Sequence, residues 1–578
     1  MREVGADGNV AGVELRSNFP STSALAVTRR AQWASLGISP EDLDRPKVAI
    51  VNTSNDLAAC FAHLDPIVTV LKEELRGLGL LPFEVRTAAP SDFITSAGRG
   101  GRYILPSRDL IANDIETMVE GAQLDAMICL SSCDKTTPGH LMAAGRIDVP
   151  TVIVPCGYQH SGLADGDGGD VEEIFFEAAK QSVGGRIDPE LLALADRAIR
   201  GPGVCAGLAT ANSMHMCAEA MGMAVGDSAP VRANSERMWD AVRRAARALA
   251  GAIERDIRPR QVITAGSITN AARLMLAVGG SVNTIKHLQA IAEEAGVDVD
   301  VWETYRTLGR QTPTLCSVRP NGPHLTEDLE EAGGAATVLR ELLPLLDPDQ
   351  LTVEGVRLGE RLAEAPAADG TTVRTLDEPA SRTPAIVVLR GSLAAEGAVA
   401  KRPIPDPGPR SFRGPARVFH SREEGLQGIA EGRIRPGDVA IIRGIGLVGG
   451  PAMGMISAFV FALDARDLGE SVAVITDGQT SGLVNHGIVI GEVSPEAATG
   501  GALGLVEDGD IIDIDLAEGR VDLLVAPEVL AARTPYEPRS DVDTHGLLDQ
   551  YRAVVGPLAC GAVLCGRAPL ERRGGAAR

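Results

Sequence analysis

Aromatic residues are scarce in this sequence, at 3% of 578 residues, so its hydrophobic cores must consist mainly of Val, Leu, Ile, Ala and Met. No apolar run approaches the roughly 18 residues that a membrane-spanning helix needs, since the longest, MISAFVFAL, ends at Asp464. The N-terminus lacks the apolar segment of a secretory signal. Basic residues are also fewer than acidic ones, and the resulting net charge of −22 argues against a nucleic-acid partner. These absences favour a cytoplasmic enzyme without a membrane partner.

The nine cysteines are too few and too scattered for a disulfide framework in a chain of this length. They indicate free thiols, and with them a possible metal or cluster site. The 44% hydrophobic content and 65 glycines are typical of a globular α/β protein with many tight turns. The length exceeds what one hydrophobic core can organise, so at least two domains are expected.

The N-terminal part of the chain alternates apolar strands with amphipathic helices. The runs VAIVNTS, FEVRTAA, AMICLSS and PTVIVPC are β-branched and apolar, and helical segments such as DPIVTVLKEELRGLG separate them. Continuous apolar strands in this alternation predict a parallel sheet covered on both faces. We therefore predict a large α/β domain over residues 1–375.

The C-terminal part has a different pattern, which begins after the Ala-, Pro- and Thr-rich stretch APAADGTTVRTLDEPASRTPA. Short strands dominate from there on, and AEGR joins DIIDIDL to VDLLVA as in a β-hairpin. These features predict a second, β-rich domain over residues 385–560, built on a barrel or a sandwich. Residues 561–578 are expected to form a frayed tail.

Polar residues follow three of the predicted parallel strands. Cys60 comes after the first, Asp92 after the second, and Cys133, Asp134 and Lys135 after the third. Because the carboxyl ends of parallel strands form one ligand-binding edge, these side chains are expected to converge there.

Cys205, in GVCAGLATANSM, is a third candidate ligand beside Cys60 and Cys133. Consecutive cysteines of this set lie about 70 residues apart, far wider than the pairs of a small zinc site. Such ligands suit a cluster held between loops of a large fold, with one iron position left open. The alternative is that all the cysteines are small buried hydrophobic residues.

Several segments resemble the dihydroxy-acid dehydratases, a family that also contains phosphogluconate and sugar-acid dehydratases. They run in the family order from about residue 16 to about residue 555, and they are NTSNDLAAC, SCDKTTPGHLMAAGRIDVPTVIV, GVCAGLATANSM, GSLAAEGAV, ITDGQTSG and GEVSPEAATGG. The resemblance implies an iron–sulfur hydro-lyase that converts a 2,3-dihydroxy acid to a 2-oxo acid. It also implies a homodimer or a homotetramer.

The resemblance further implies the site. Cys60, Cys133 and Cys205 match the ligands of a 2Fe–2S or 4Fe–4S cluster. A nearby Mg²⁺ would be held by Asp92, by Asp134 and by a carbamylated Lys135, since carbamylation turns an ammonium into an anionic oxygen ligand. Ser481 matches the serine that takes the C2 proton, and its alternative role is that of an ordinary turn residue.

The sequence departs from the family pattern on the metal and substrate side. Met455 occupies the position of a glutamate that normally ligates Mg²⁺, and a thioether is a poor ligand for this ion. Ile445 and Val448 replace a glutamate and a lysine of the same loop, and Phe93 replaces a glycine after Asp92. We therefore expect an intact cluster site with a remodelled cation and substrate side. The alternative is a paralogue that still binds the cluster but has lost dehydratase activity.

Two other motifs suggest different functions. Gly444, Gly446 and Gly449 match a GxGxxG dinucleotide fingerprint, which would indicate an NAD-linked oxidoreductase, but no acidic residue follows at the required distance. Asp165, Asp167 and Asp170 hint at calcium, but they lack the spacing of an EF-hand and its closing glutamate. An acidic surface loop is the favoured interpretation of the second motif.

Overall fold

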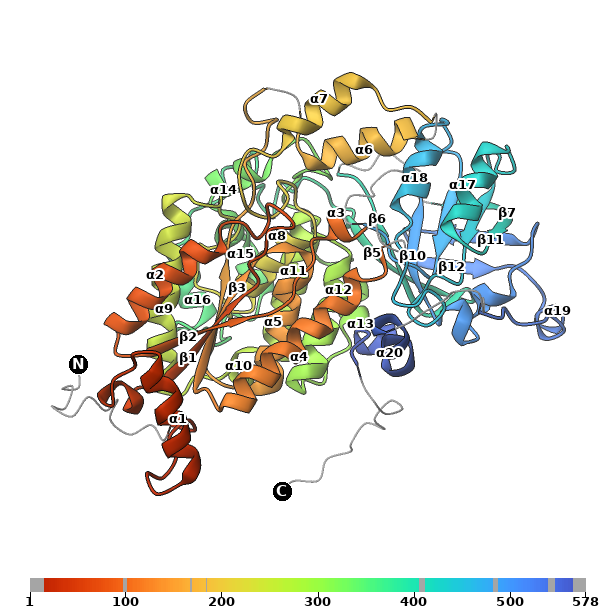
Figure 1. Ribbon diagram of the computed structural model, residues 1–578. Coiled ribbons are helices and arrows are strands. Elements are labelled where there is room, and N and C mark those ends of the chain that lie inside the picture. The colour runs from red at the N-terminus through yellow and green to blue at the C-terminus, as the bar shows by residue number, and fades with distance from the viewer. Residues whose placement is uncertain are drawn as a thin grey trace.

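The computed structural model describes residues 15–96, 101–166, 169–182, 185–404, 411–481, 487–538 and 546–564. It has an N-terminal α/β part and a C-terminal β-barrel, which lie side by side in Figure 1. The predicted fold class is thus confirmed. In the described chain, no helix combines the length and the apolar character needed to cross a membrane.

The N-terminal sheet is fully parallel, with strand order β2-β1-β3-β4. Helices α2 and α9 pack together on one face, and α4 and α5 pack together on the other. The strands are β1 Lys47–Asn52, β2 Leu81–Arg86, β3 Ala126–Ser131 and β4 Thr151–Pro155, and these helices are α2 Leu64–Gly77, α4 Ile104–Ala122, α5 Cys133–Ile147 and α9 Glu236–Arg255. Every residue of β1 and β3 is buried, which explains their unbroken apolar runs.

A second helical layer packs behind α5. Helix α8 contacts α5 and α11, and α12 contacts α5 and α13, so that α8 and most of α12 are enclosed. The larger helices of this layer are α8 Thr210–Ala220, α11 Ala265–Val278, α12 Asn283–Ala295, α13 Val301–Leu308 and α15 Gly334–Glu341. Shorter helices at its margin are α10 Pro259–Val262, α14 Thr326–Glu331 and α16 Leu358–Leu362, and α1 Ala24–Ser35 projects from the other end of the domain.

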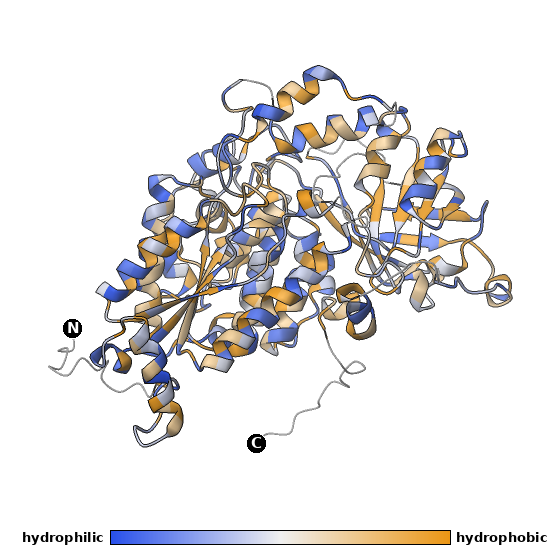
Figure 2. Cartoon of the chain, viewed as in Figure 1, coloured by the Kyte–Doolittle hydropathy of each residue, from blue (hydrophilic) through white to orange (hydrophobic). Residues whose placement is uncertain are grey.

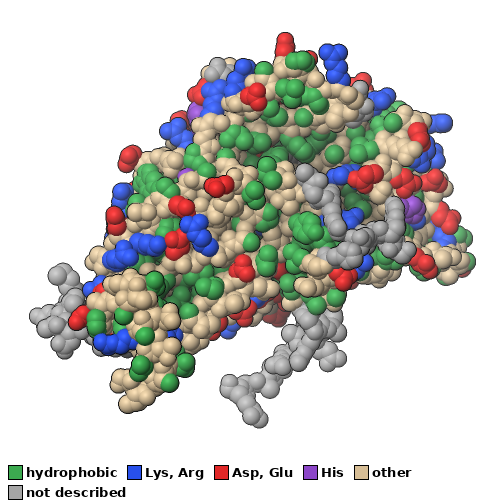
Figure 3. Space-filling model, in the orientation of Figure 1, with side chains coloured by type: hydrophobic (Ala, Val, Ile, Leu, Met, Phe, Trp, Pro, Cys, Tyr) green, Lys and Arg blue, Asp and Glu red, His purple; other side chains and the backbone are tan. Residues whose placement is uncertain are grey.

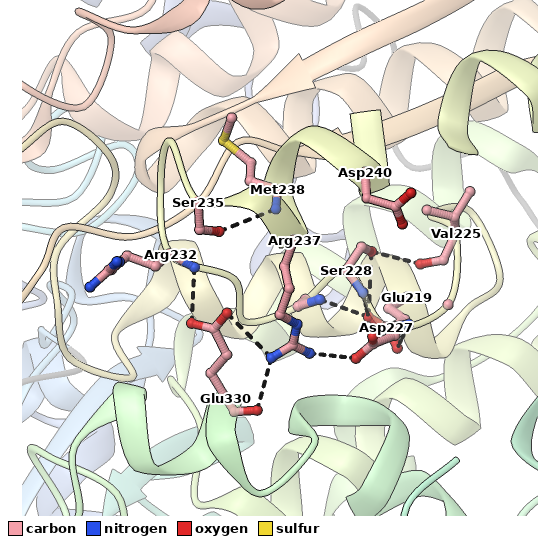
Figure 4. Close-up of polar contacts among 12 residues, drawn as sticks. Glu219, Val225, Asp227, Ser228, Arg232, Ser235, Arg237, Met238, Asp240 and Glu330 are labelled. Atoms are coloured by element: carbon pink, nitrogen blue, oxygen red, sulfur yellow. Dashed lines mark hydrogen bonds and ion pairs between the residues drawn. The ribbon is translucent and has the colours of Figure 1, made fainter. Parts of the chain in front are cut away.

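The loop between α8 and α9 is held by charged side chains, of which Glu219 is buried (Figure 4). The carboxylate of Glu219 accepts hydrogen bonds from the backbone N–H groups of Asp227, Ser228 and Ala229 at 2.8–3.0 Å. Arg237 then links Asp227 to Glu330. This network fixes the loop without a regular strand or helix.

The barrel closes in the order β10-β6-β5-β12-β11-β7-β8-β9. The predicted hairpin is its antiparallel pair β11–β12, with Asp515 opposite Arg520. The strands are β5 Ile386–Gly391, β6 Ala394–Lys401, β7 Ser411–Phe419, β8 Val439–Ile442, β9 Ala473–Thr476, β10 Val489–Ser494, β11 Ile511–Asp515 and β12 Arg520–Leu523. Strands β7 to β10 run parallel, and α17 Arg422–Ala430 and α18 Ser457–Asp464 pack beside them.

The two parts meet at helix α6, Val171–Ser182, which is followed by α7, Pro189–Ala198. The rings of Phe176 on α6 and Phe461 on α18 pack edge to face, with centroids 4.7 Å apart. After the short α19, Pro527–Ala531, the chain returns to the N-terminal part through α20, Leu547–Val554, which packs on α4. Arg108 of α4 donates a hydrogen bond to the carbonyl of Ala562, which follows α20, at 2.8 Å. The chain is therefore folded back across its own domain junction.

Hydrophobic residues concentrate in the strands of both domains and on the inner sides of the helices (Figure 2). On the face shown in Figure 3, acidic and basic side chains are interspersed rather than gathered into a patch of one sign. The net negative charge thus does not produce a single acidic surface on this face.

Candidate active site

Cys60 and Cys133 lie against each other at the carboxyl edge of the parallel sheet. A hydrogen bond between the two thiols lowers the pKa of Cys60 below its ordinary value and raises that of Cys133. The Ser132 hydroxyl also donates to the carbonyl of Cys60 and ties the two loops together. The structure therefore brings together the first two predicted cysteines.

Cys205 approaches this pair from the loop before α8. Burial and the negative charge of Asp92 raise the pKa of Cys205, and its charge in turn raises the pKa of Cys133. Cys205 is half-buried and faces the same cavity as Cys133. All three predicted cysteines thus belong to one site, and each of the three has a free thiol.

Helix α5 begins at Cys133, which has a positive φ of 35°. The helix is enclosed from Cys133 to Gly145, and its positive N-terminal end lies at the cysteine, where it favours negative charge. His140, about two turns along, bonds to Ser131 at 2.9 Å, and burial lowers its pKa to about 3. His140 is therefore a neutral packing residue beside the site.

The predicted cation ligands are also close together. Asp92 begins the short helix α3, Asp92–Thr95, and its Oδ1 lies 3.8 Å from the Sγ of Cys133. Burial and the charge of Asp134 raise the pKa of Asp92 to about 6. Lys135 is buried and donates a hydrogen bond to Asp134. Two carboxylates that repel each other in this way are typical of a site that can accept a cation.

One partly open cavity of about 50 Å³ unites residues from both domains. Asp92, Asp134 and Cys133 line it from the N-terminal domain, and Met455 and Ser481 line it from the barrel. Cys60 and Lys135 lie behind this wall, where both are buried. The structure therefore assembles the predicted residues at a single cavity. The N-terminal domain contributes the cysteines, and the barrel contributes the serine.

The loop that precedes α18 is anchored by two buried carboxylates of the barrel. Asp477 accepts hydrogen bonds from the backbone N–H groups of Gly444 and Ile445 at 3.0 Å. Glu496 accepts those of Val448, at 2.7 Å, and Gly449, at 3.3 Å. In a dinucleotide-binding loop, such N–H groups face the pyrophosphate. Because protein carboxylates occupy them here, the GxGxxG match is a structural loop and the NAD interpretation is wrong.

The acidic loop that suggested calcium has a structural explanation as well. Asp165 bonds to His160 at 3.0 Å and to Arg200 at 2.8 Å, and Asp170 accepts the backbone N–H groups at the start of α6. Asp167 lies outside the described residues. Within the described part of this loop, the carboxylates are used by the protein itself.

Several cavity residues were not anticipated from the sequence. Glu172 on α6 is 1% exposed, and burial with the charge of Asp170 raises its pKa to about 8. Phe175 and Asn283 also line the cavity. Their helices carry no motif that marks them, because helical periodicity alone does not tell a cavity wall from a core contact.

Gln479 and Ser457 complete the barrel side of the cavity wall. Both are 1% exposed, and neither the amide of Gln479 nor the hydroxyl of Ser457 has a hydrogen-bond partner. Buried polar groups without partners cost about 1–3 kcal/mol each. Their orientation into a cavity makes them available to a bound molecule. Gln479 alone had a sequence signal, since it stands two residues before Ser481.

Comparison with known proteins decides the family. The N-terminal model of the dihydroxy-acid/6-phosphogluconate dehydratases matches residues 45–361, and the C-terminal model matches residues 371–562. This chain belongs to that family. It is 38% identical over 555 residues to a dihydroxy-acid dehydratase of Aquifex aeolicus, covering 96% of this chain and all of that protein. It is 39% identical over 558 residues to a dihydroxy-acid dehydratase of Methanothrix thermoacetophila, covering 95% of this chain and all of that protein. The chain is accordingly an enzyme of the hydro-lyase class.

Proposed function

We propose that this member of the dehydratase family uses an iron–sulfur cluster to convert a 2,3-dihydroxy carboxylic acid to a 2-oxo acid and water. The observation that carries the proposal is the cavity shared by Cys133, Cys205, two carboxylates and Ser481, with Cys60 directly behind it. A binding module or a structural protein needs no such convergence of thiols and carboxylates from two domains.

The donor set fits a cluster better than a single metal ion. In the ranges that the structure describes, no three His, Cys, Asp or Glu side chains converge closely enough to hold one ion. A cluster has several iron atoms, so its cysteines bind different atoms and need not converge on one point. Cys60, Cys133 and Cys205 would hold it, at the positive end of α5. When bound, a cluster with an open iron position supplies a Lewis acid that makes hydroxide a better leaving group.

Ser481 is the proposed proton acceptor because it faces the cavity from the barrel, opposite the cluster residues. Its oxygen takes the proton from C2, and the electrons of the C–H bond form the C2–C3 double bond. The C3–oxygen bond breaks, and the departing hydroxide gains a proton to become water. The resulting enol gains a proton at C3 and loses the proton of its C2 hydroxyl, which gives the 2-oxo acid. A neutral serine is a weak base, so this step needs positive charge nearby.

The cation side of the site is proposed to be altered. Asp92 and Asp134 offer the hard oxygen ligands that Mg²⁺ prefers, whereas Met455 lines the cavity where the family resemblance implies a glutamate. Lys135 can contribute only as a carbamate, because an ammonium has no lone pair to donate. We infer that any cation here is held by fewer carboxylates than the resemblance implies, and hence more weakly.

The charge of the cavity favours a substrate without phosphate. Three of the described lining residues are acids, Asp92, Asp134 and Glu172, and the described lining contains no Lys, Arg or His. Phosphate recognition normally relies on Arg or Lys. Part of the wall is apolar instead, where the rings of Phe93 and Phe175 pack edge to face with centroids 5.6 Å apart.

The test is turnover by anaerobically purified enzyme, measured as 2-oxo acid formed from a panel of alkyl-substituted, sugar-derived and phosphorylated dihydroxy acids. We expect turnover of an uncharged-chain acid and little or none of phosphorylated ones. Ser481→Ala should abolish turnover and leave the visible absorption of the cluster unchanged. Ser471→Ala, at an exterior turn of the barrel, is the matched control and should retain activity. A cluster-loaded wild-type enzyme that converts none of the acids would instead support the paralogue without dehydratase activity.

A further inference from the structure

A buried ion pair joins the two domains beside the cavity. Lys286 lies in the first turn of α12, and Glu492 lies in barrel strand β10. The Lys286 ammonium donates a hydrogen bond to one carboxylate oxygen of Glu492, and both side chains are 0% exposed. Burial of two opposite charges is costly unless they are paired. The pair therefore specifies how the barrel sits on α12.

On the N-terminal side, the contact continues into the cavity wall. Lys286 also donates to the side-chain oxygen of Asn283, and the Asn283 amide donates to the hydroxyl of Thr210 at 3.0 Å. That hydroxyl bonds to Ser281 at 2.9 Å. Asn283 and Thr210 both line the cavity. One end of the ion pair thus fixes the orientation of polar groups that face the substrate.

On the barrel side, the contact continues toward Ser481. The backbone N–H of Glu492 donates to the carbonyl of Gly478 at 2.9 Å, three residues before the serine. A Cβ added to the neighbouring Gly491 would stand 2.7 Å from the Cγ2 of Thr480, so β10 packs closely on this loop. Glu492 consequently touches the segment that carries the proposed proton acceptor.

The backbone at Glu492 supports a specific role for its side chain. Its φ is +58°, a conformation that favours glycine, and the pairing of β10 with β6 shifts register between Gly491 and Ser494. Irregular strand geometry of this kind re-aims a side chain and is often found beside active sites. Here it directs the carboxylate inward to Lys286 instead of letting the strand continue regularly.

From these contacts we propose that Lys286 and Glu492 are positioning residues for the reaction. They hold Asn283 on one side of the cavity and the Gly478–Ser481 segment on the other in a fixed mutual arrangement. Reaction rates depend steeply on such alignment, and a displacement of about 1 Å can cost 100-fold. Apolar contacts alone do not set this register, because they lack direction. The inference rests on the proposed function for its kinetic test but also has a test independent of turnover.

The kinetic test compares Lys286→Met, Glu492→Gln and the double variant K286M/E492Q, all loaded with cluster. Each should lower kcat by about 100-fold while KM changes much less. The iron content per chain and the affinity for substrate should stay close to those of the wild type. The double variant carries no uncompensated buried charge, so it should recover thermal stability but not kcat. If the double variant recovers kcat as well as thermal stability, the ion pair is only a structural contact and the proposal is overturned.

The second test is hydrogen exchange, which needs no substrate. In K286M/E492Q, the amides of Gln479 and its neighbours should exchange faster than in the wild type, and those of the β11–β12 hairpin should not. Arg533→Met is the matched control, since Arg533 pairs with Asp510 in the same barrel, away from the cavity lining. It should lower stability without changing kcat or the exchange at Gln479. Unchanged exchange at Gln479 in the double variant would contradict the proposal even if the wild-type enzyme turned over no dihydroxy acid.

Discussion

Replacement of Gly139 by alanine should damage the cluster site through packing alone. Gly139 lies in the interior of α5, the helix that begins at Cys133. An added Cβ would stand 2.8 Å from the carbonyl oxygen of Arg108 and 3.0 Å from a methyl carbon of Ile111. Both neighbours belong to α4, and one is backbone, so neither can move aside without shifting a helix. Alanine is therefore expected to push α4 and α5 apart.

The magnitude follows from two opposing effects. Overpacking a close-packed interior costs about 1–3 kcal/mol, and the upper part of this range applies where backbone must move. Alanine regains about 1 kcal/mol over glycine through helix propensity. The net loss is about 2 kcal/mol. At about 2 °C per kcal/mol for a domain of this size, the unfolding midpoint should fall by roughly 4 °C.

Gly121→Ala in α4 is the matched control. Gly121 is exposed, and nothing lies within 4 Å of an added Cβ, so only the propensity gain remains. Its midpoint should rise by roughly 2 °C. The assay is thermal unfolding followed by circular dichroism, together with iron retained after gel filtration. Shifts of the same sign in both variants would refute the packing argument, as would a Gly139→Ala protein that keeps both its midpoint and its iron.

Two further predictions concern the cysteines and the histidines. Cys133→Ser should lose bound iron, whereas Cys316→Ser, at a buried cysteine outside the cavity lining, should keep it; equal iron in both proteins would remove Cys133 from the ligand set. Burial lowers the pKa of His140 to about 3 and of His215 to about 4, so both stay neutral when folded but gain protons when unfolded below about pH 6.5. Each should then reduce the free energy of unfolding by about 1.4 kcal/mol per pH unit between pH 6.5 and the folded pKa. Because buried acids with raised pKa values, such as Asp92 and Glu172, act in the opposite direction, the check compares the unfolding midpoints of the wild type and His215→Asn at pH 7 and pH 5.5. A midpoint difference between the two proteins that does not change with pH would contradict the prediction.

Much of the site could be predicted because parallel strands have a simple geometry. Cys60, Asp92 and Cys133 each follow a buried strand, and all three strands end at one edge of the sheet. Apolar runs locate such strands in the sequence, so the convergence follows from topology without any knowledge of side-chain contacts. Cys205 and Ser481 follow no strand of this sheet. Cys205 was a candidate through its wide spacing from the other two cysteines, and the inclusion of Ser481 depended on the family resemblance.

Other features could not be predicted, for physical reasons. Strand β6, AAEGAVAK, has too many small residues for a clear alternation of polar and apolar positions. Lys286 and Glu492 are 206 residues apart, and each taken alone is typical of an exposed surface. Only the barrel's placement on α12 reveals that they pair. The homo-oligomeric state and the cytoplasmic location stay predictions.

The central claim is that Cys60, Cys133 and Cys205 hold an iron–sulfur cluster beside the cavity. The most direct test is the content of iron and acid-labile sulfide per chain in protein purified without oxygen. Two or four irons with matching sulfide are predicted, and the number would also distinguish a 2Fe–2S from a 4Fe–4S cluster. Absence of iron and sulfide, even after anaerobic reconstitution, would contradict the account and leave the three thiols as buried packing residues.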